Sequence, residues 1–254
     1  GCRFGVYNPN AQAIVTNLNE CSKYNPLDEK GDDLKGAEIA ISIKTKIKDH
    51  ELAFYAYDGF YKAPKGLISG SPLVGYHPGL QVFGVSDEGQ WGPGIFTFEY
   101  GYYNSTEDKD GESYLIENSK HKYLVGYRLD INANLSVGGQ WYQEKLQDYD
   151  KYKTGFFAAN PAGYAYRLAE YRNTYTLRLT YKAQQETLWF NFFAYLRIED
   201  EDSFSKFEVS KKFSDNFKLT VGLNIFTGKD NYLDREFGML RADDNAFIRM
   251  NYSF

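Results

Sequence analysis

The stretch DNAFIRMNYSF, residues 244–254, alternates between apolar and polar residues as far as its last position. Successive side chains of a β-strand point to opposite faces of a sheet, so a strand between two different environments shows a period of two. The stretch therefore predicts a strand with one apolar face and one polar face. Phe247 is the one apolar residue on the polar face. The apolar positions are Ala246, Ile248, Met250, Tyr252 and Phe254.

The same alternation recurs along the chain in segments of about ten residues, separated by polar stretches that contain turn-forming residues. No segment shows a helical period, so we predict an all-β chain with a single domain. The predicted strands are 36–47, 51–61, 79–86, 94–103, 122–131, 135–144, 174–182, 187–198, 206–213, 217–226 and an eleventh that ends at Phe254.

The connections between these segments alternate in length, which is typical of an antiparallel up-and-down meander with two distinct ends. Long polar segments separate the pairs of strands that the short turns join. The predicted short turns are 48–50, 88–92, 132–134, 184–186 and 214–216, and the longer segments are 1–35, 62–78, 104–121, 145–173, the brief 199–203, and 227–244.

The composition limits the class of protein. The chain has 254 residues, of which 43% are hydrophobic and 18% aromatic, with 23 Tyr and 19 Phe. Its mean hydropathy is −0.56, and no stretch approaches the roughly 18 consecutive apolar residues of a transmembrane helix. A transmembrane β-strand needs only about 9–11 residues with alternating apolar positions. The formal net charge of −5 argues against a nucleic-acid partner.

Three features favour a transmembrane β-barrel over a soluble β-sandwich. The predicted strands have the length that crosses a bilayer at a tilt, and Tyr and Phe gather toward the strand ends as in interfacial girdles. Charges of both signs lie in the middle of the polar faces, which suits a water-filled lumen. The apolar face then meets outer-membrane lipid.

The ending FIRMNYSF (247–254) also resembles the C-terminal signal of bacterial outer-membrane barrels. This resemblance implies that the barrel assembly machinery recognises Ile248, Met250, Tyr252 and Phe254 during biogenesis. Longer stretches are similar to an uncharacterised porin family related to alginate-export-type barrels, which implies a porin in the outer membrane of a Gram-negative bacterium. These stretches are YHPGLQVFGVS (76–86), FEYGYYNSTEDKDG (98–111), KYLVGYRLDINANLSVGGQWYQE (122–144) and NIFTGKDNYLDREFGMLRADDNAFIRMNYSF (224–254).

The barrel topology has consequences for the beginning of the chain. If Phe254 is periplasmic, the short turns are periplasmic, the long segments are extracellular, and residues 1–35 are an N-terminal extracellular segment before the barrel residues 36–254. Closure would pair the last strand with the first. Eleven strands that begin outside do not complete such a barrel, so either a twelfth strand lies within residues 2–8 or the chain is the C-terminal part of a larger barrel. We favour the larger barrel. In the N-terminal segment we predict a disulfide between Cys2 and Cys21, with two unpaired thiols as the alternative.

Charged side chains on the polar faces are the candidate pore lining. More bases than acids lie there, which predicts a preference for anions. The alternative is that these charges pair across neighbouring strands and fill the lumen. The bases are Lys44, Lys46, Lys122, Arg128, Arg178, Lys182, Arg197, Lys206, Lys212, Lys218 and Arg249, and the acids are Glu38, Glu99, Asp130, Glu144 and Glu208.

Three further groups of residues have simpler explanations. Asp108, Asp110 and Glu112 could bind calcium, but they lack the full calcium-loop pattern, and solvated loop charge is the favoured interpretation. The aromatic residues Trp189, Phe193 and Tyr195 either form a track for solutes or pack against an inserted loop. The histidines His50, His77 and His121 fall in separate connections, and no G-x-S-x-G motif occurs. We therefore predict no enzymatic activity, cofactor or metal site.

These patterns predict a porin-type channel for passive diffusion of small polar solutes. One alternative is a structural barrel that encloses a partner protein or an exported polymer, and another is a soluble β-sandwich binding module. A homo-oligomer is a further expectation about partners.

Overall fold

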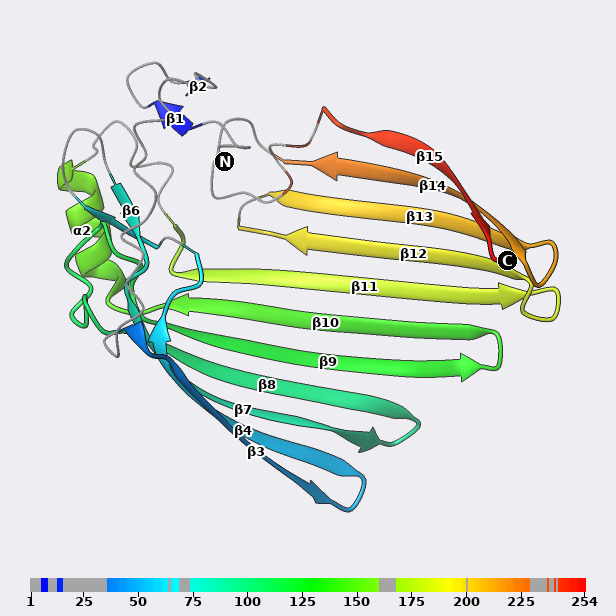
Figure 1. Ribbon diagram of the computed structural model, residues 1–254, viewed down its shortest axis with the longest axis horizontal. Helices are drawn as coiled ribbons and strands as arrows, with labels where there is room; N and C mark the ends of the chain where they lie inside the picture. The colour runs from blue at the N-terminus through cyan, green and yellow to red at the C-terminus, as the bar shows by residue number, and fades with distance from the viewer. Residues whose placement is uncertain are drawn as a thin grey trace.

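The computed structural model describes residues 6–8, 13–15, 36–63, 65–68, 74–159, 168–199, 201–228, 237, 240 and 242–254. Eleven strands in this part of the chain form one antiparallel sheet, in which the hydrogen-bonded neighbours follow the order of the sequence. The prediction of eleven strands in an up-and-down arrangement is confirmed (Figure 1). The strands are β3 (Ile39–Ile47), β4 (His50–Phe60), β7 (Gly79–Trp91), β8 (Gly94–Ser105), β9 (Lys120–Asn132), β10 (Leu135–Leu146), β11 (Tyr171–Ala183), β12 (Leu188–Arg197), β13 (Asp202–Lys212), β14 (Phe217–Thr227) and β15 (Asn245–Tyr252).

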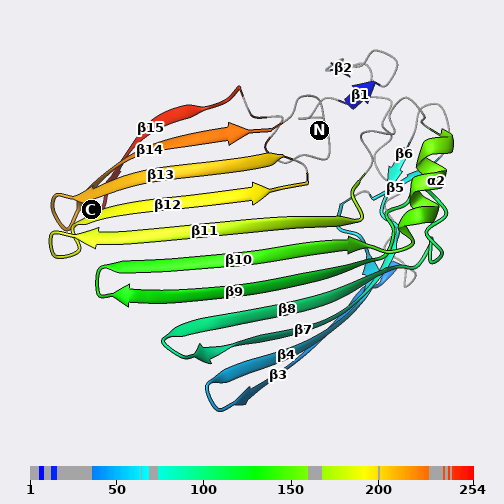
Figure 2. The same ribbon diagram turned by 180° about the vertical axis from the view of Figure 1, so that it is seen from behind.

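The sheet is a single curved layer with two different ends (Figure 2). Short connections join consecutive strands at one end, which we call the turn end, and the long connections lie at the other, which we call the loop end. The predicted turn 88–92 is too long, because β7 continues to Trp91 and the chain reverses at Gly92, whose φ of 60° favours glycine.

The large sheet has two edges, β3 and β15, and among the described residues each of these strands has one hydrogen-bonded neighbour. The expected pairing of the last strand with the first is therefore wrong for this part of the chain. An odd number of antiparallel strands explains it: β3 and β15 both run from the loop end to the turn end, so they cannot form an antiparallel pair with each other. Within residues 2–8, β1 (Val6–Asn8) pairs with β2 (Ala13–Val15) and not with the large sheet.

The loop end carries further structure that the alternation did not predict. β5 (Gly66–Ile68) and β6 (Val74–Tyr76) form a small hairpin there, and α2 (Tyr149–Ala159) lies beside it (Figure 1). The prediction of no helix is wrong. Tyr149, Tyr152 and Phe156 recur at helical spacing within the predicted loop 145–173, and their rings contact one another.

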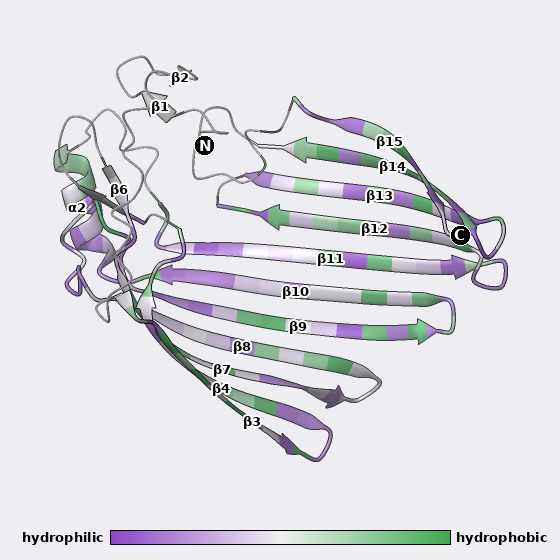
Figure 3. Ribbon diagram, in the orientation of Figure 1, coloured by the Kyte–Doolittle hydropathy of each residue, from purple (hydrophilic) through white to green (hydrophobic). Residues whose placement is uncertain are grey.

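Hydrophobic and hydrophilic residues are interspersed along each strand (Figure 3). The register places them on two different faces, and the apolar face is open to its surroundings. Ile43, Leu177, Phe190 and Ile248 all lie on this face and are exposed. Buried apolar side chains are few among the described residues: Ala53, Tyr61, Leu80, Leu146 and Tyr152. A soluble sandwich buries its apolar face against a second sheet, and no second sheet covers this face in the described part of the chain. The apolar face therefore suits a lipid environment.

The contrast between the two faces gives a prediction at adjacent positions of β11. Leu177→Arg puts a charge on the apolar face near the middle of the strand, and should lower the free energy of unfolding in lipid vesicles by about 2–4 kcal/mol. Thr176→Arg changes the neighbouring residue, which faces the polar side, and should have a much smaller effect. Denaturant titration followed by heat-modifiable migration in gels measures both. Equal losses for the two variants would contradict the assignment of the faces.

Candidate pore-lining surface

The strand register places every predicted pore-lining residue except Glu38 on one face of the sheet. For example, Lys122 lies opposite Glu144, Glu144 lies opposite Arg172, and Arg178 lies opposite Phe193 in successive strand pairs. Continuing this alternation across all eleven strands gives one polar face. Its basic residues are Lys44, Lys46, Lys120, Lys122, Arg128, Arg172, Arg178, Lys182, Arg197, Lys206, Lys212, Lys218 and Arg249, and its acidic residues are Glu51, Glu88, Glu99, Asp130, Glu144, Asp202 and Glu208.

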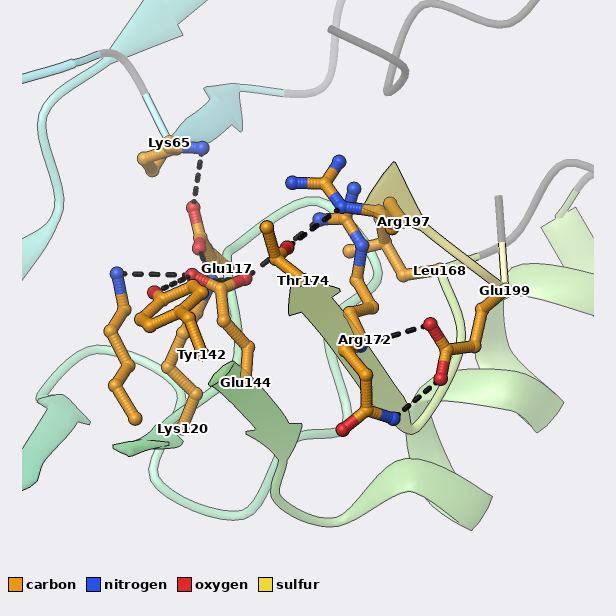
Figure 4. A network of polar contacts seen from close by, with 12 residues as sticks. Lys65, Glu117, Lys120, Tyr142, Glu144, Leu168, Arg172, Thr174, Arg197 and Glu199 are labelled. Carbon is orange, nitrogen blue, oxygen red and sulfur yellow. Dashed lines mark hydrogen bonds and ion pairs between the residues drawn. The ribbon is translucent and has the colours of Figure 1, made fainter. Parts of the chain in front are cut away.

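The largest cavity that we describe opens on this face at the loop end and has a volume of about 750 Å³. Its charged lining comes from strands and from connections. Lys120, Glu144, Arg172 and Arg197 lie on strands, and Lys65 and Glu117 lie in connections (Figure 4). Lys122, also on β9, completes the charged lining. Five cationic and two anionic side chains therefore line it. Five tyrosines, Tyr61, Tyr103, Tyr114, Tyr142 and Tyr152, also line it.

Glu117 joins two long connections at the mouth of this cavity. Its carboxylate pairs with Lys65, at 2.9 Å, and with Lys120 at the start of β9. Its backbone N–H also donates to the carbonyl of Lys65 at 2.9 Å. Burial by itself would raise the pKa of Glu117, but the two lysines outweigh it, so the pKa lies below the ordinary value of a glutamate.

Glu144 is the central acid of the cavity. Its carboxylate oxygens lie 3.1 Å from Lys122 Nζ, 3.8 Å from Arg172 Nη1 and 4.0 Å from Lys120 Nζ. The Tyr142 hydroxyl donates to the same carboxylate at 2.6 Å. Three cations and one hydroxyl thus converge on a single carboxylate.

Further along the polar face, several cations lie over aromatic rings. Lys218 Nζ is 4.9 Å from the Trp189 ring centroid, and the guanidinium of Arg178 is 5.7 Å from that of Phe193. Arg249 lies 5.3 Å from the ring of Phe247, the residue that breaks the alternation of the last strand. Contacts of this kind stabilise a cation without cancelling its charge.

Other bases form ion pairs, as the alternative interpretation of the polar face expects. Lys206 pairs with Glu208 at 2.9 Å, and Lys44 pairs with Glu51 at 3.7 Å. Some bases of the polar face therefore form ion pairs and others lie over aromatic rings. The basic residues of this face still outnumber the acidic ones.

The predicted aromatic track is divided between two environments. Trp189 and Phe193 carry cations, whereas Tyr195 packs edge-to-face against Phe237, at 4.9 Å. The N–H of Phe237 donates to the carboxylate of Asp202, at 3.1 and 3.2 Å, and its ring stacks on Phe204 at 5.1 Å. Of the two alternatives, Tyr195 therefore follows the second, because it packs against a residue of the last long connection.

The candidate calcium ligands do not converge. The Asp108 carboxylate accepts the N–H groups of Glu112 and Ser113, at 3.0 and 3.1 Å, and so caps its own loop. Glu112 is exposed and lies 3.5 Å from Lys151. In the described part of the chain, no three His, Cys, Asp or Glu side chains are arranged to hold a metal ion. Cys2 and Cys21 lie outside the described residues.

The three histidines lie apart from one another. His50 is at the turn end, where Nδ1 is 3.0 Å from the Asp87 carboxylate. His77 contacts the carbonyl of Tyr61 at 2.6 Å, and His121 contacts the hydroxyl of Tyr100 at 2.8 Å, both toward the loop end. No two of them share a site.

The sequence missed several members of the polar face. Lys120 and Arg172 fall within predicted long connections, because β9 and β11 begin earlier than the alternation indicated. Extending the same period backwards from Lys122 and from Thr174 would have included both residues. Lys65 could not have been found in this way, because it reaches the cavity from a connection. Glu38, predicted to line the pore, instead pairs with Lys62 just outside the strands.

Comparison with solved structures supports the fold. The outer membrane channel DcaP of Acinetobacter baumannii matches 85% of this chain and 62% of that chain, with a TM-score of 0.51 and 11% identity. The chain shares the β-barrel fold of this structure, with a sheet that is open at β3 and β15 in the described residues. It spans 62% of the length of the DcaP structure. The KdgM porin in complex with disordered oligogalacturonate matches 87% of this chain and 94% of that chain, with a TM-score of 0.33 and 10% identity.

The sequence comparisons give no family. No protein-family model matches the sequence, and no curated protein matches it. The relation to alginate-export-type barrels therefore stays a prediction. In the part of the chain that the structure describes, no helix combines the length and the apolar character needed to cross a membrane.

Removing the Glu117 carboxylate should loosen the loop end. Because the folded-state pKa is depressed, Glu117 stabilises the native state above the ordinary glutamate pKa of about 4.3, and this contribution is lost as the pH falls through the depressed value. At pH 7, Glu117→Gln should cost about 1.5–3 kcal/mol, the range for hydrogen bonds to charged groups.

Thermal unfolding of wild type and variant between pH 7 and pH 3 measures this effect. The difference in stability should shrink toward acidic pH. Glu112→Gln, which removes a largely exposed partner of Lys151, is the control. A difference that is independent of pH would contradict the role of the ion pairs.

Proposed function

We propose that the chain forms the wall of a channel through which small polar solutes, preferentially anions, diffuse passively. The observation that carries the proposal is the division of one sheet into two faces. The exposed apolar side chains of the strands gather on one face. The cavities open on the other face, which carries thirteen basic and seven acidic residues. An apolar outer face with a hydrated, charged inner face is what a membrane channel needs.

An excess of bases is found at three places on the polar face. Besides the loop-end cavity, a cavity of about 320 Å³ in the middle of the sheet is lined by Arg128, Arg178 and Glu88. Another, of about 470 Å³, lies at the turn end beside Lys212, Lys218 and Arg249, with Glu208 and Asp215 as its acids. In each cavity the basic residues outnumber the acidic ones. Positive charge at these three places raises the local concentration of anions there.

We further propose that the protein resides in the outer membrane of a Gram-negative bacterium, with its short turns in the periplasm. The side chains of Ile248, Met250 and Tyr252 are exposed on the apolar face, and the exposed ring of Phe254 lies 5.5 Å from that of Tyr252. This arrangement supports a role for them both in lipid contact and in recognition by the assembly machinery. The match to the DcaP channel, at the level of the fold, supports the same placement.

Recording from planar bilayers tests the channel. We expect single-channel steps and a reversal potential on the anion-selective side in a KCl gradient. A protein that gives no steps and co-purifies with another protein in its lumen would favour a structural barrel instead and would overturn the channel.

Charge reversal in the middle of the polar face should change the selectivity. Arg178→Glu should lower the chloride-to-potassium permeability ratio by about twofold or more at 0.1 M salt. At 1 M salt the effect should be smaller, because the Debye length falls from about 10 Å to about 3 Å. Lys109→Glu makes the same change in charge at an exposed position of a long connection and should leave the ratio nearly unchanged. Equal shifts for both variants would show that Arg178 does not line the path.

A further inference from the structure

Glu144 differs from every other acid that lines the three cavities in the number of cations that it holds. Lys120, Lys122 and Arg172 all lie within 4.0 Å of its carboxylate. Glu208 at the turn end, by comparison, pairs with Lys206. Lys120 also pairs with Glu117, which holds Lys65 as well, so four cations and two carboxylates give this cluster a formal charge of +2. Arg197 lines the same cavity.

The donors around Glu144 have the chemistry of an oxyanion site. Ammonium groups, a guanidinium fork and a phenol hydroxyl are the groups that bind carboxylates and phosphates, and charge-assisted hydrogen bonds of this kind are the strong ones. The Tyr142 hydroxyl donates at 2.6 Å, and Lys122 Nζ lies at 3.1 Å. These donors hold a carboxylate that belongs to the protein itself.

The position of this carboxylate is open to solutes. Glu144 projects from the polar face of β10 into the cavity of about 750 Å³, which is large enough for a small organic anion. Glu117, the other acid of the cavity, lies in a connection and is held by a backbone hydrogen bond to Lys65 as well as by its ion pairs. Glu144 belongs to a strand whose backbone stays in place when the side chain turns away.

We propose that Glu144 is a tethered competitor: its carboxylate occupies the position that the anionic group of a solute takes in transit, and it thereby weakens the binding of that group. The inference rests on the proposed channel function. A channel must bind a solute well enough to admit it and weakly enough to release it. When a carboxylate or phosphate displaces Glu144, the same cations exchange one anion for another. The cluster therefore keeps a counter-ion throughout the passage.

The test compares phosphate block in single-channel recordings of wild type and Glu144→Gln, with inorganic phosphate as the probe. If Glu144 competes, the variant should be blocked at a phosphate concentration about two- to fivefold lower, the factor that corresponds to a partly exposed ion pair. Its chloride-to-potassium permeability ratio should also rise. Acetate should likewise block Glu144→Gln at a lower concentration than wild type, because the site recognises oxyanions as a class.

Two controls separate this role from others. Asp150→Asn removes a largely exposed carboxylate of α2, paired with Lys153, and should leave the phosphate block unchanged; a similar shift there would overturn the proposal in favour of a general charge effect. If Glu144 only holds the basic side chains in place, Glu144→Gln should weaken the block, which would also overturn it.

A further variant keeps the proposal testable if Glu144→Gln does not assemble. Lys122→Gln removes one of the donors and should weaken the block by phosphate relative to wild type, and an unchanged block would overturn the proposal. The absence of channel steps in the wild type would instead reject the channel function itself, so the two failures can be told apart.

Discussion

Hydrogen bonding between neighbouring strands is the interaction on which the rest of this structure depends. In lipid, no water satisfies an unpaired backbone group, so a chain that crosses as strands must pair each strand on both sides. The nine strands from β4 to β14 in the large sheet meet this requirement within the described residues, and β3 and β15 meet it on one side. Apart from a register shift between Leu135 and Ser136 at the start of β10, antiparallel pairing also makes every second side chain share one face.

The alternation then separates two environments with one layer of protein. Side chains such as Ile43 and Ile248 are exposed on one face because the favourable neighbour for them is lipid and not a second sheet. Side chains such as Lys122 and Arg178 occupy the other face, where water and counter-ions can solvate them. The sheet thus needs no hydrophobic core of the usual kind, and its buried apolar residues are few and include loop-end contacts such as Leu146 and Tyr152.

The loop end adds selectivity to this simple wall. Glu117 pairs with Lys65 beside the cavity, and Glu144, on β10, pairs with cations from the two neighbouring strands β9 and β11. Lys65 approaches from a connection whose course follows from tertiary contacts and not from any period in the sequence. The helix α2 also could not be predicted, because its three aromatic positions are a weak signal inside a long polar segment.

The sequence by itself determined the number of strands in the large sheet, their order and the side of that sheet on which nearly every charged strand residue lies, because a period of two is a local property that pairing preserves. It did not determine which of those charges meet. The tertiary structure decided that Lys120, Lys122 and Arg172 converge on Glu144. It also decided that the N–H of Phe237 donates to Asp202 and that β3 and β15 are open edges. Register between strands and the course of the loops depend on contacts between residues far apart in the chain, and such contacts leave no periodic trace in the sequence.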